Sequence, residues 1–326
     1  MDSNKRKIAG WLANSFVVIG AILVLALSFG GFFPQVDWRL GWYSHPRPHF
    51  AVLSIAAIIW LAVQKKWLLA LLPFLAFAIN FVVLAPYFIG SPDQTLTVGP
   101  SLSILHLNTN KGEASFSDIE QFGADVVFLQ EVTPELVQTF EEKLPNYRLV
   151  FSHPLENTHG SAMLIANDTK LDVFSPRINH LPEDNVRPLL SVNAVLDGQD
   201  IQLLSMHAIR PHHIGADEYQ QVEYDAVATW GKAQIERGDE LVMIGDFNAT
   251  PWSQRFKGFL EDSQTADSML GFGIQNSWIV FLPMWLGLPI DHAVVSNGLV
   301  VVERETESVR GSDHGLLFVR LALIDS

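Results

Sequence analysis

The chain has 326 residues, no cysteine and a net charge of −14, which excludes disulfide bonds and metal sites built from thiolates. The charge is divided unevenly, because residues 91–326 contain 14 Lys and Arg against 33 Asp and Glu, a net charge of −19. This part has no basic stripe of the kind that binds nucleic acid by counterion release, although a divalent cation can supply positive charge locally.

Residues 1–90 are predicted to be a membrane anchor. They contain three apolar runs without Asp, Glu, Lys or Arg. About 20 apolar residues cross the hydrocarbon core of a bilayer, so we predict transmembrane helices at about 8–33, 48–64 and 67–89. The short middle run also fits a buried core helix. The first run also fits a signal peptide, but it is too long for one and has no clear small-x-small cleavage site.

The basic residues around these runs predict the orientation of the chain. Three of them precede the first run and Lys65 and Lys66 separate the second run from the third, whereas Arg39 and Arg47 lie in the remaining loop. By the positive-inside rule, the N-terminus and the turn at Lys65 face the cytoplasm. Three crossings then place the rest of the chain on the extracytoplasmic side of a bacterial inner or plasma membrane, after a predicted linker at residues 91–100.

Residues 101–326 alternate short Val-, Ile- and Leu-rich runs with amphipathic segments. Strands are predicted at 102–107, 126–129, 162–165, 189–196, 201–206, 241–244, 293–295 and 316–321, and helices at 115–122, 134–144 and 216–235. Many short strands with few helices are typical of an α/β sandwich, with sheets inside and helices outside.

Polar residues lie next to five of these apolar runs. They are Asn108 to Asn110, Gln130-Glu131, His207, Asp246 to Asn248, and Ser312 to His314. Each one alone also fits a capped strand end or a turn. Burying such groups singly costs a few kcal/mol unless they are paired, so together they predict one shared polar site at one edge of the sheets.

In this order, the set resembles the signature of the endonuclease/exonuclease/phosphatase superfamily, which includes deoxyribonuclease-I-like nucleases. The resemblance covers residues 102–321 and is carried by Gln130-Glu131, Gly245-Asp246-Phe247-Asn248 and Ser312-Asp313-His314, with Asn108, His207 and Ile290-Asp291-His292. It implies a four-layer sandwich of two β-sheets flanked by helices. It also implies a hydrolase of phosphoester bonds that uses Mg²⁺, with Mn²⁺ as the alternative.

The resemblance implies a metal site around Glu131. A hard carboxylate oxygen suits Mg²⁺, and Asp313 is expected in the same coordination sphere. Asn110 stands where several members of the superfamily have an aspartate, so it offers a neutral ligand at best and weakens or shifts the site. Glu131 also fits a solvated acid at a helix N-terminus, because Thr133-Pro134 follow it.

The remaining roles are catalytic by the same resemblance. Asp246 orients or deprotonates the attacking water and Asn248 donates to a phosphoryl oxygen. The two flank one residue of an extended segment and therefore share a face. His314 binds the scissile phosphate and stabilises the transition state, while Asp291 fixes the tautomer and orientation of that imidazole.

Two further positions complete the predicted site. His207 matches a second phosphate-side histidine of the nuclease and sphingomyelinase branches, although it also fits a core histidine. Asn108 is expected to donate to the phosphate or to orient Asp246. The other histidines, His106 among them, have no motif that supports a place in the site.

Three functions fit these observations. The first is a nuclease-like phosphodiesterase acting on DNA or RNA outside the cytoplasm. The second is a phosphodiesterase or phosphatase for lipid or inositol-type headgroups, which a membrane tether would hold beside its substrate. The third is an inactive membrane-linked binding module, and the complete set of site residues argues against it. No protein partner can be inferred from the sequence.

Overall fold

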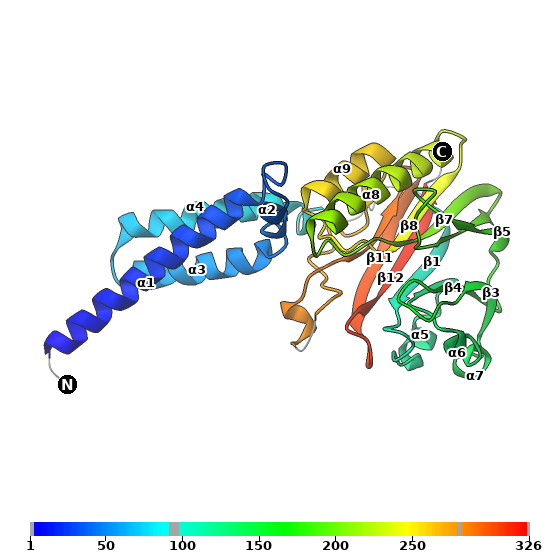
Figure 1. Ribbon diagram of the computed structural model, residues 1–326, viewed down its shortest axis with the longest axis horizontal. Helices are drawn as coiled ribbons and strands as arrows, with labels where there is room; N and C mark the ends of the chain where they lie inside the picture. The colour runs from blue at the N-terminus through cyan, green and yellow to red at the C-terminus, as the bar shows by residue number, and fades with distance from the viewer. Residues whose placement is uncertain (1–2, 91–97, 280–281, 325–326) are drawn as a thin grey trace. The chain divides into compact units, whose positions relative to one another are not determined.

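The structure, a computed structural model, describes residues 3–90, 98–279 and 282–324. It forms two compact units, an N-terminal unit up to Pro86 and a C-terminal unit that begins at Tyr87 (Figure 1). The predicted linker at 91–100 lies mostly outside the described residues.

The N-terminal unit is helical. Its helices are α1 (Ser3–Gly30), α2 (Trp38–Trp42), α3 (Arg47–Val63) and α4 (Trp67–Leu84), followed by the 3₁₀ turn η1 (Ala85–Tyr87). Two of its segments, Ile8–Gly30 and Trp67–Tyr87, are long and apolar enough to cross a membrane, with mean hydropathies of 2.3 and 2.6. Helix α3 is apolar but has only 17 residues, and all three membrane crossings stay predictions.

A buried polar network joins the three long helices of this unit. The Asn80 side chain of α4 donates to Ser28 Oγ of α1 at 2.8 Å and accepts a hydrogen bond from Arg47 Nη1 of α3 at 3.2 Å. Between apolar helices, hydrogen bonds of this kind fix which faces meet, because an unpaired amide there would be costly.

The C-terminal unit is built on two six-stranded sheets. The first has the order β11-β12-β1-β2-β4-β3 and the second β5-β6-β7-β8-β10-β9. The strands of the first sheet are β1 (Val98–Asn108), β2 (Val126–Gln130), β3 (Tyr147–His153), β4 (Ser161–Ala166), β11 (Leu299–Ser308) and β12 (Gly315–Ile324). Those of the second are β5 (Asp172–Asn179), β6 (Leu189–Leu196), β7 (Gln199–His207), β8 (Glu240–Asp246), β9 (Ala266–Asp267) and β10 (Asp291–Val295).

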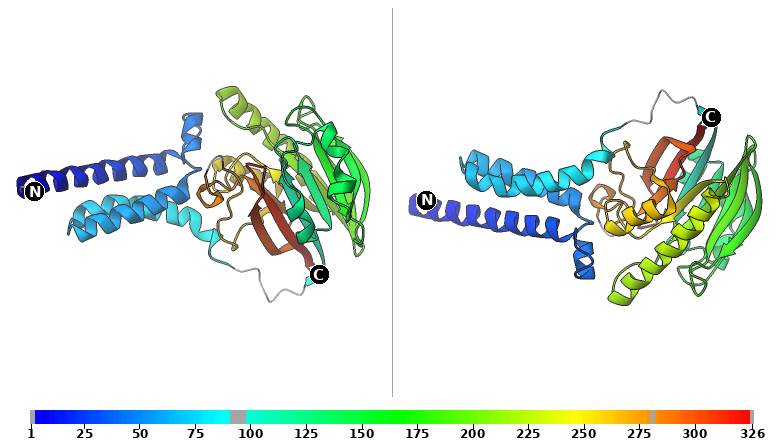
Figure 2. Two further views of the ribbon diagram at one scale, coloured as in Figure 1. Left: turned by 90° about the horizontal axis from the view of Figure 1, so that it is seen from below. Right: turned by 90° about the horizontal axis from the view of Figure 1, so that it is seen from above.

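Helices cover the outer faces of both sheets (Figures 1 and 2). On the first sheet lie α5 (Ser117–Phe122), α6 (Pro134–Val137) and α7 (Phe140–Lys143), and on the second lie α8 (Ile214–Ile235) and α9 (Gln254–Ser263). One apolar core fills the space between the sheets, and one lies under each helical layer. The predicted four-layer sandwich is thereby confirmed.

The eight predicted strands are the eight inner strands of the two sheets, and the four edge strands β3, β5, β9 and β11 were not predicted. An edge strand has one side in water and often carries polar or charged residues, so it loses the apolar pattern. The predicted helix 134–144 is in fact two short helices, α6 and α7. The Thr139 hydroxyl donates to Leu136 O at 2.8 Å where the chain turns between them.

Two parallel pairs, β1 with β2 and β7 with β8, decide where the polar ends meet. The registers place Asn108 opposite Gln130 in the first sheet and His207 opposite Asp246 in the second. Asp291 of the antiparallel strand β10 lies opposite Asp246 as well. The carboxyl ends of the parallel strands therefore bring the predicted site residues to one edge of each sheet.

Gly245 of β8 lies against the backbone of the neighbouring strand β7 and the Gln130 side chain of the first sheet. Its φ is 147°, and a Cβ placed there would lie 2.0 Å from Met206 O and 2.6 Å from the Gln130 amide nitrogen. We expect Gly245→Ala to lower the free energy of unfolding of the C-terminal unit by more than about 3 kcal/mol. Chemical denaturation of the full chain in detergent measures this change.

Gly258→Ala is the matched control. Gly258 lies inside α9 with open space where its Cβ would be, so the substitution should raise stability by about 0.5–1 kcal/mol. If Gly245→Ala is as stable as Gly258→Ala, there is room for a Cβ at Gly245 and its backbone is not this close to Met206 and Gln130.

Candidate active site

A buried carboxylate with two histidines forms the centre of the site. Asp291 Oδ2 lies 2.9 Å from His314 Nδ1, and Asp291 Oδ1 lies 3.0 Å from His106 Nε2. Asp291 and His106 are fully buried and His314 is 6% exposed. Asp291 belongs to the second sheet, whereas the histidines lie on β1 and immediately before β12 of the first. One carboxylate thus joins the two sheets.

His106 is the residue that sequence reasoning missed. It lies two residues before Asn108 on β1, and alternation along a strand puts both side chains on the same face. That spacing was the available signal, and the apolar neighbours Leu105 and Leu107 obscured it. The carboxylate of Asp291 requires His106 to donate from Nε2, and the other ring nitrogen has no partner within the described part of the chain.

Asp246 and Asn248 lie beside this centre. Asp246 Oδ2 is 3.9 Å from His314 Nε2. The backbone N–H of Asn248 donates to Asp246 Oδ1 at 2.7 Å, and its amide nitrogen donates to Asp246 Oδ2 at 2.9 Å and to Ala208 O at 3.0 Å. Asn248 therefore fixes the orientation of the carboxylate, and His314 and Asp246 face the same space.

Glu131 and Asn108 form a second group of site residues. The amide nitrogen of Asn108 donates to Glu131 Oε1 at 3.2 Å, and Asn108 Oδ1 accepts from the Asn110 backbone N–H at 3.1 Å. The structure thus brings Asn108 to Glu131 instead of to Asp246. The amide nitrogen of Asn110 donates to Gly311 O at 3.2 Å, away from Glu131.

Asp313 and His207 lie at the margins of the site. Asp313 Oδ2 accepts a hydrogen bond from Trp278 Nε1 at 3.1 Å, and its charge reaches Glu131. Burial and the positive charge of His314 lower the pKa of His207, which keeps this imidazole neutral at pH 7.

The Gln130 side chain connects the two sheets beside the site. Its amide nitrogen donates to Ser205 Oγ at 3.1 Å and to Met206 O at 2.5 Å, and its Oε1 accepts from the Asp246 backbone N–H at 3.4 Å. Gln130 ends β2 of the first sheet, and its partners lie on β7 and β8 of the second. It therefore holds the ends of three strands at a fixed separation.

Three of the site residues have strained backbones. Glu131, Asn248 and Asn110 have φ values of 56°, 50° and 47°, in the left-handed region that non-glycine residues rarely adopt. Each costs of order 1–3 kcal/mol and persists only where the surroundings determine it. Glu131 and Asn248 adopt this conformation just after β2 and β8 end, where the extended backbone stops.

The buried charges shift one another's pKa values. Burial and the Asp291 carboxylate raise the pKa of Asp246 to about 8. Burial acts to lower the pKa of His314, but Asp291 and Asp246 outweigh it and raise that pKa to about 10. Burial also acts to raise the pKa of Asp291, but His314 and His106 hold it well below its usual value. At neutral pH a charged His314–Asp291 pair therefore lies next to a carboxyl of unusually high proton affinity.

A metal ion would find its ligands at Glu131. Burial raises the pKa of Glu131 and the Asp313 carboxylate adds to the rise, so a cation between them would relieve unfavourable charge. Among the described residues, no group of three or more His, Asp or Glu side chains is arranged to hold an ion by itself. This set fits Mg²⁺, which takes one or two carboxylates and completes its shell with waters and substrate phosphate.

The sequence model of the Endonuclease/Exonuclease/phosphatase family matches residues 105–314, from the strand that carries His106 to His314 itself. The chain belongs to this family. The superfamily resemblance is thereby confirmed, and with it a nuclease- and phosphodiesterase-type hydrolase fold. No curated protein matches the chain in sequence.

Solved structures share the fold of the C-terminal unit. D. rerio TDP2 complexed with single strand DNA product is 16% identical, with a TM-score of 0.53 over 68% of this chain and 99% of that chain. The 3′-5′ exonuclease NExo from Neisseria meningitidis is 18% identical, with a TM-score of 0.53 over 69% of this chain and all of that chain (100%). A functionally unknown conserved protein from Enterococcus faecalis V583 is 15% identical, with a TM-score of 0.54 over 68% of this chain and 100% of its own.

His106 and His292 allow a matched test of the buried carboxylate. His292 is also fully buried, but its Nε2 lies 2.8 Å from Ala249 O and its ring packs on Phe247 and Phe256. Both His106→Ala and His292→Ala should lower the free energy of unfolding by about 2–5 kcal/mol, through the cavity that each leaves. Urea denaturation of each variant measures this loss.

Only His106→Ala should also impair phosphoester hydrolysis by the folded fraction. It leaves one oxygen of Asp291 unpaired, so the orientation of His314 relaxes and kcat should fall by about tenfold or more, with KM little changed. Equal kcat values for the two variants at a temperature where both are folded would show that His106 only fills space.

Proposed function

We propose that the chain is a divalent-metal-dependent hydrolase of phosphodiester bonds, of the nuclease type. The observation that carries this proposal is the buried series His106–Asp291–His314, which faces Asp246 across 3.9 Å at the shared edge of the two sheets. A positioned imidazolium beside a carboxyl of high proton affinity suits acid–base and electrostatic catalysis at a phosphoryl group.

In this proposal the ionised form of Asp246 takes a proton from the attacking water. Its raised pKa makes that carboxylate a stronger base than an ordinary one, the ionised fraction grows as the pH approaches 8, and two hydrogen bonds from Asn248 fix its orientation. His314 Nε2 donates to a phosphoryl oxygen that gains negative charge in the transition state, while Asp291 holds the ring through Nδ1. His207, neutral at pH 7, adds a second donor to the phosphate.

Glu131 and Asp313 are proposed to hold the metal, with Asn110 able to contribute only its amide oxygen. The ion, Mg²⁺ or alternatively Mn²⁺, supplies neutralising charge to the phosphoryl oxygens. Asn108 keeps Glu131 in place through its hydrogen bond to Oε1.

Nucleic acid is the substrate class that we propose first. The support is the likeness in fold to D. rerio TDP2 with its single strand DNA product and to the N. meningitidis 3′-5′ exonuclease. A lipid or inositol-type headgroup is the second candidate, favoured by the two helices that are long and apolar enough to cross a membrane. Assays of the full chain against DNA, RNA and phospholipid vesicles with Mg²⁺ distinguish the two.

Metal dependence has a direct test in Glu131→Gln. The substitution keeps the shape but removes the charge that holds the ion, so hydrolysis should fall by more than about 100-fold. EDTA should abolish hydrolysis by the unsubstituted chain, and added Mg²⁺ or Mn²⁺ should restore it. Initial rates on a soluble phosphodiester measure both effects.

Glu135→Gln is the control, because Glu135 is exposed on α6 four residues further along the chain. It should leave the rate unchanged. Full activity in EDTA would exclude the metal mechanism.

We also propose three membrane crossings, with the C-terminal unit on the extracytoplasmic side. A C-terminal alkaline phosphatase fusion should then be active, because that enzyme folds only outside the cytoplasm, and a green fluorescent protein fusion should be dark. Fusions at residue 66, in the turn between α3 and α4, should show the opposite pattern. A bright fluorescent fusion at the C-terminus would mean two crossings.

A further inference from the structure

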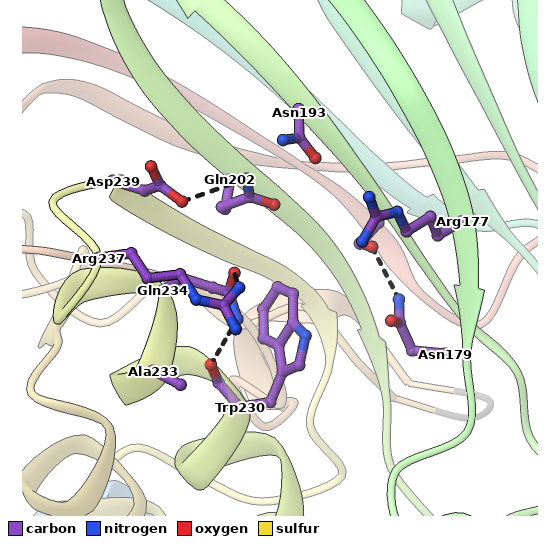
Figure 3. Close-up of a pocket in the computed structure, with 10 residues that line it drawn as sticks. Arg177, Asn179, Asn193, Gln202, Trp230, Ala233, Gln234, Arg237 and Asp239 are labelled. Atoms are coloured by element: carbon purple, nitrogen blue, oxygen red, sulfur yellow. Dashed lines mark hydrogen bonds between the residues drawn. The ribbon is translucent and has the colours of Figure 1, made fainter.

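A polar pocket lies on the outer side of the second sheet, away from the active site. Its volume is about 350 Å³, within the range of small-molecule sites. It is lined by residues of β5, β6, β7 and the end of α8 (Figure 3). Gln202 of β7 lines the pocket, whereas His207 of the same strand reaches the active site five residues later, roughly 16 Å along the strand.

The pocket exists because two facing surfaces change from apolar to polar together. On β6 and β7, the side chains that point toward α8 are apolar nearer the active-site end of the strands, as in Leu204, and polar nearer the other end, as in Asn193 and Gln202. On α8, the face that packs with Tyr224 and Val227 continues toward the C-terminus as Trp230, Ala233, Gln234 and Arg237, at the helical spacing i, i+3, i+4 and i+7.

Several polar groups in the pocket have unused hydrogen-bonding capacity. Within the described chain, the Arg177 guanidinium, the Asn193 amide and the Trp230 indole N–H have no hydrogen-bond partner. Gln202 is only 6% exposed, and its amide nitrogen makes one long hydrogen bond, 3.4 Å, to Asp239. Arg177 is exposed and Asn193 and Trp230 are half-buried, so their free donors and acceptors face the open pocket, where a polar ligand can take the place of water.

The charge of the pocket favours an anion. Arg177 reaches in from β5 and Arg237 from the end of α8, on either side of Trp230 in Figure 3, against the single carboxylate of Asp239. This local excess of positive charge stands out in a part of the chain with a net charge of −19. The Arg237 guanidinium donates a hydrogen bond to Gln234 Oε1 at 3.1 Å. A free guanidinium such as that of Arg177 can donate two parallel hydrogen bonds to two phosphate oxygens.

We propose that this pocket binds a nucleoside monophosphate. The Trp230 indole stacks on the base, and Asn193 and Gln202, which each offer a donor and an acceptor, pair with the edge of the base. Arg177 pairs with the phosphate, and Arg237 adds positive potential. A nucleoside monophosphate is also what an exonuclease releases, and only this link to turnover rests on the proposed function.

Calorimetric titration of the full chain in detergent with AMP, GMP, CMP and UMP tests the proposal. EDTA in the buffer prevents metal-bridged binding at the active site. At least one nucleotide should bind at one site per chain, at least about tenfold more tightly than ribose 5-phosphate or the matching nucleoside. Equal binding of ribose 5-phosphate, preferred binding of a neutral disaccharide such as maltose, or no binding by any nucleotide would overturn it.

Substitutions locate the site. Arg177→Gln and Asn193→Asp should each weaken binding at least about tenfold, the second by removing the amide donor that pairs with the base and by adding a negative charge to an anion-binding pocket. Arg148→Gln removes an exposed arginine from the first sheet and should have no effect. Trp230→Leu removes the stacking surface but also removes core packing. If that variant does not fold, Asn193→Asp still tests the site.

Asp246→Asn separates this site from the active site. Nucleotide binding should be unchanged in that variant, because Asp246 lies at the opposite end of its strand from the pocket. Loss of binding in Asp246→Asn would place the nucleotide in the active site and refute the proposal. Nucleotide binding by an unsubstituted chain that hydrolyses no phosphodiester would refute the proposed function alone.

Discussion

The structure depends on one buried carboxylate. Asp291 has no contact with solvent, and a carboxylate in such a place is strongly unfavourable unless both its oxygens are paired. The partners are His106 and His314, and both come from the opposite sheet. The same contacts that make the burial of Asp291 tolerable therefore set how the two sheets meet, and they orient the imidazole proposed to act on phosphate.

The position of the site could be predicted because its residues follow apolar runs that form inner strands. A buried strand is recognised in the sequence as a run of apolar residues, and a polar residue directly after such a run stands out. Edge strands such as β5, with Arg177 and Asn179 facing water or the pocket, carry no such pattern and were missed. His106 was missed because its partner is 185 residues away in the chain, and no local pattern encodes a contact of that range.

Unfavourable charge is concentrated where the substrate would bind. Asp246, Glu131 and Asp313 lie close enough to act on one another, and burial raises the pKa values of the first two. A protein that only needed stability would replace such groups with apolar ones. Their presence, with the strained backbones of Glu131 and Asn248, indicates that stability is given up for a prearranged binding geometry.

The hydrogen bond between Ser312 and Asn108 spans 204 residues and joins the segment before β12 to the end of β1. The site is therefore assembled from the first and last strands of the catalytic unit. A nascent chain therefore has no complete site until β12 has been synthesised and has paired with β1. Until then, Asp246 and Asp291 lack the imidazole of His314, so the parts of the site stay separate while the preceding strands are being made.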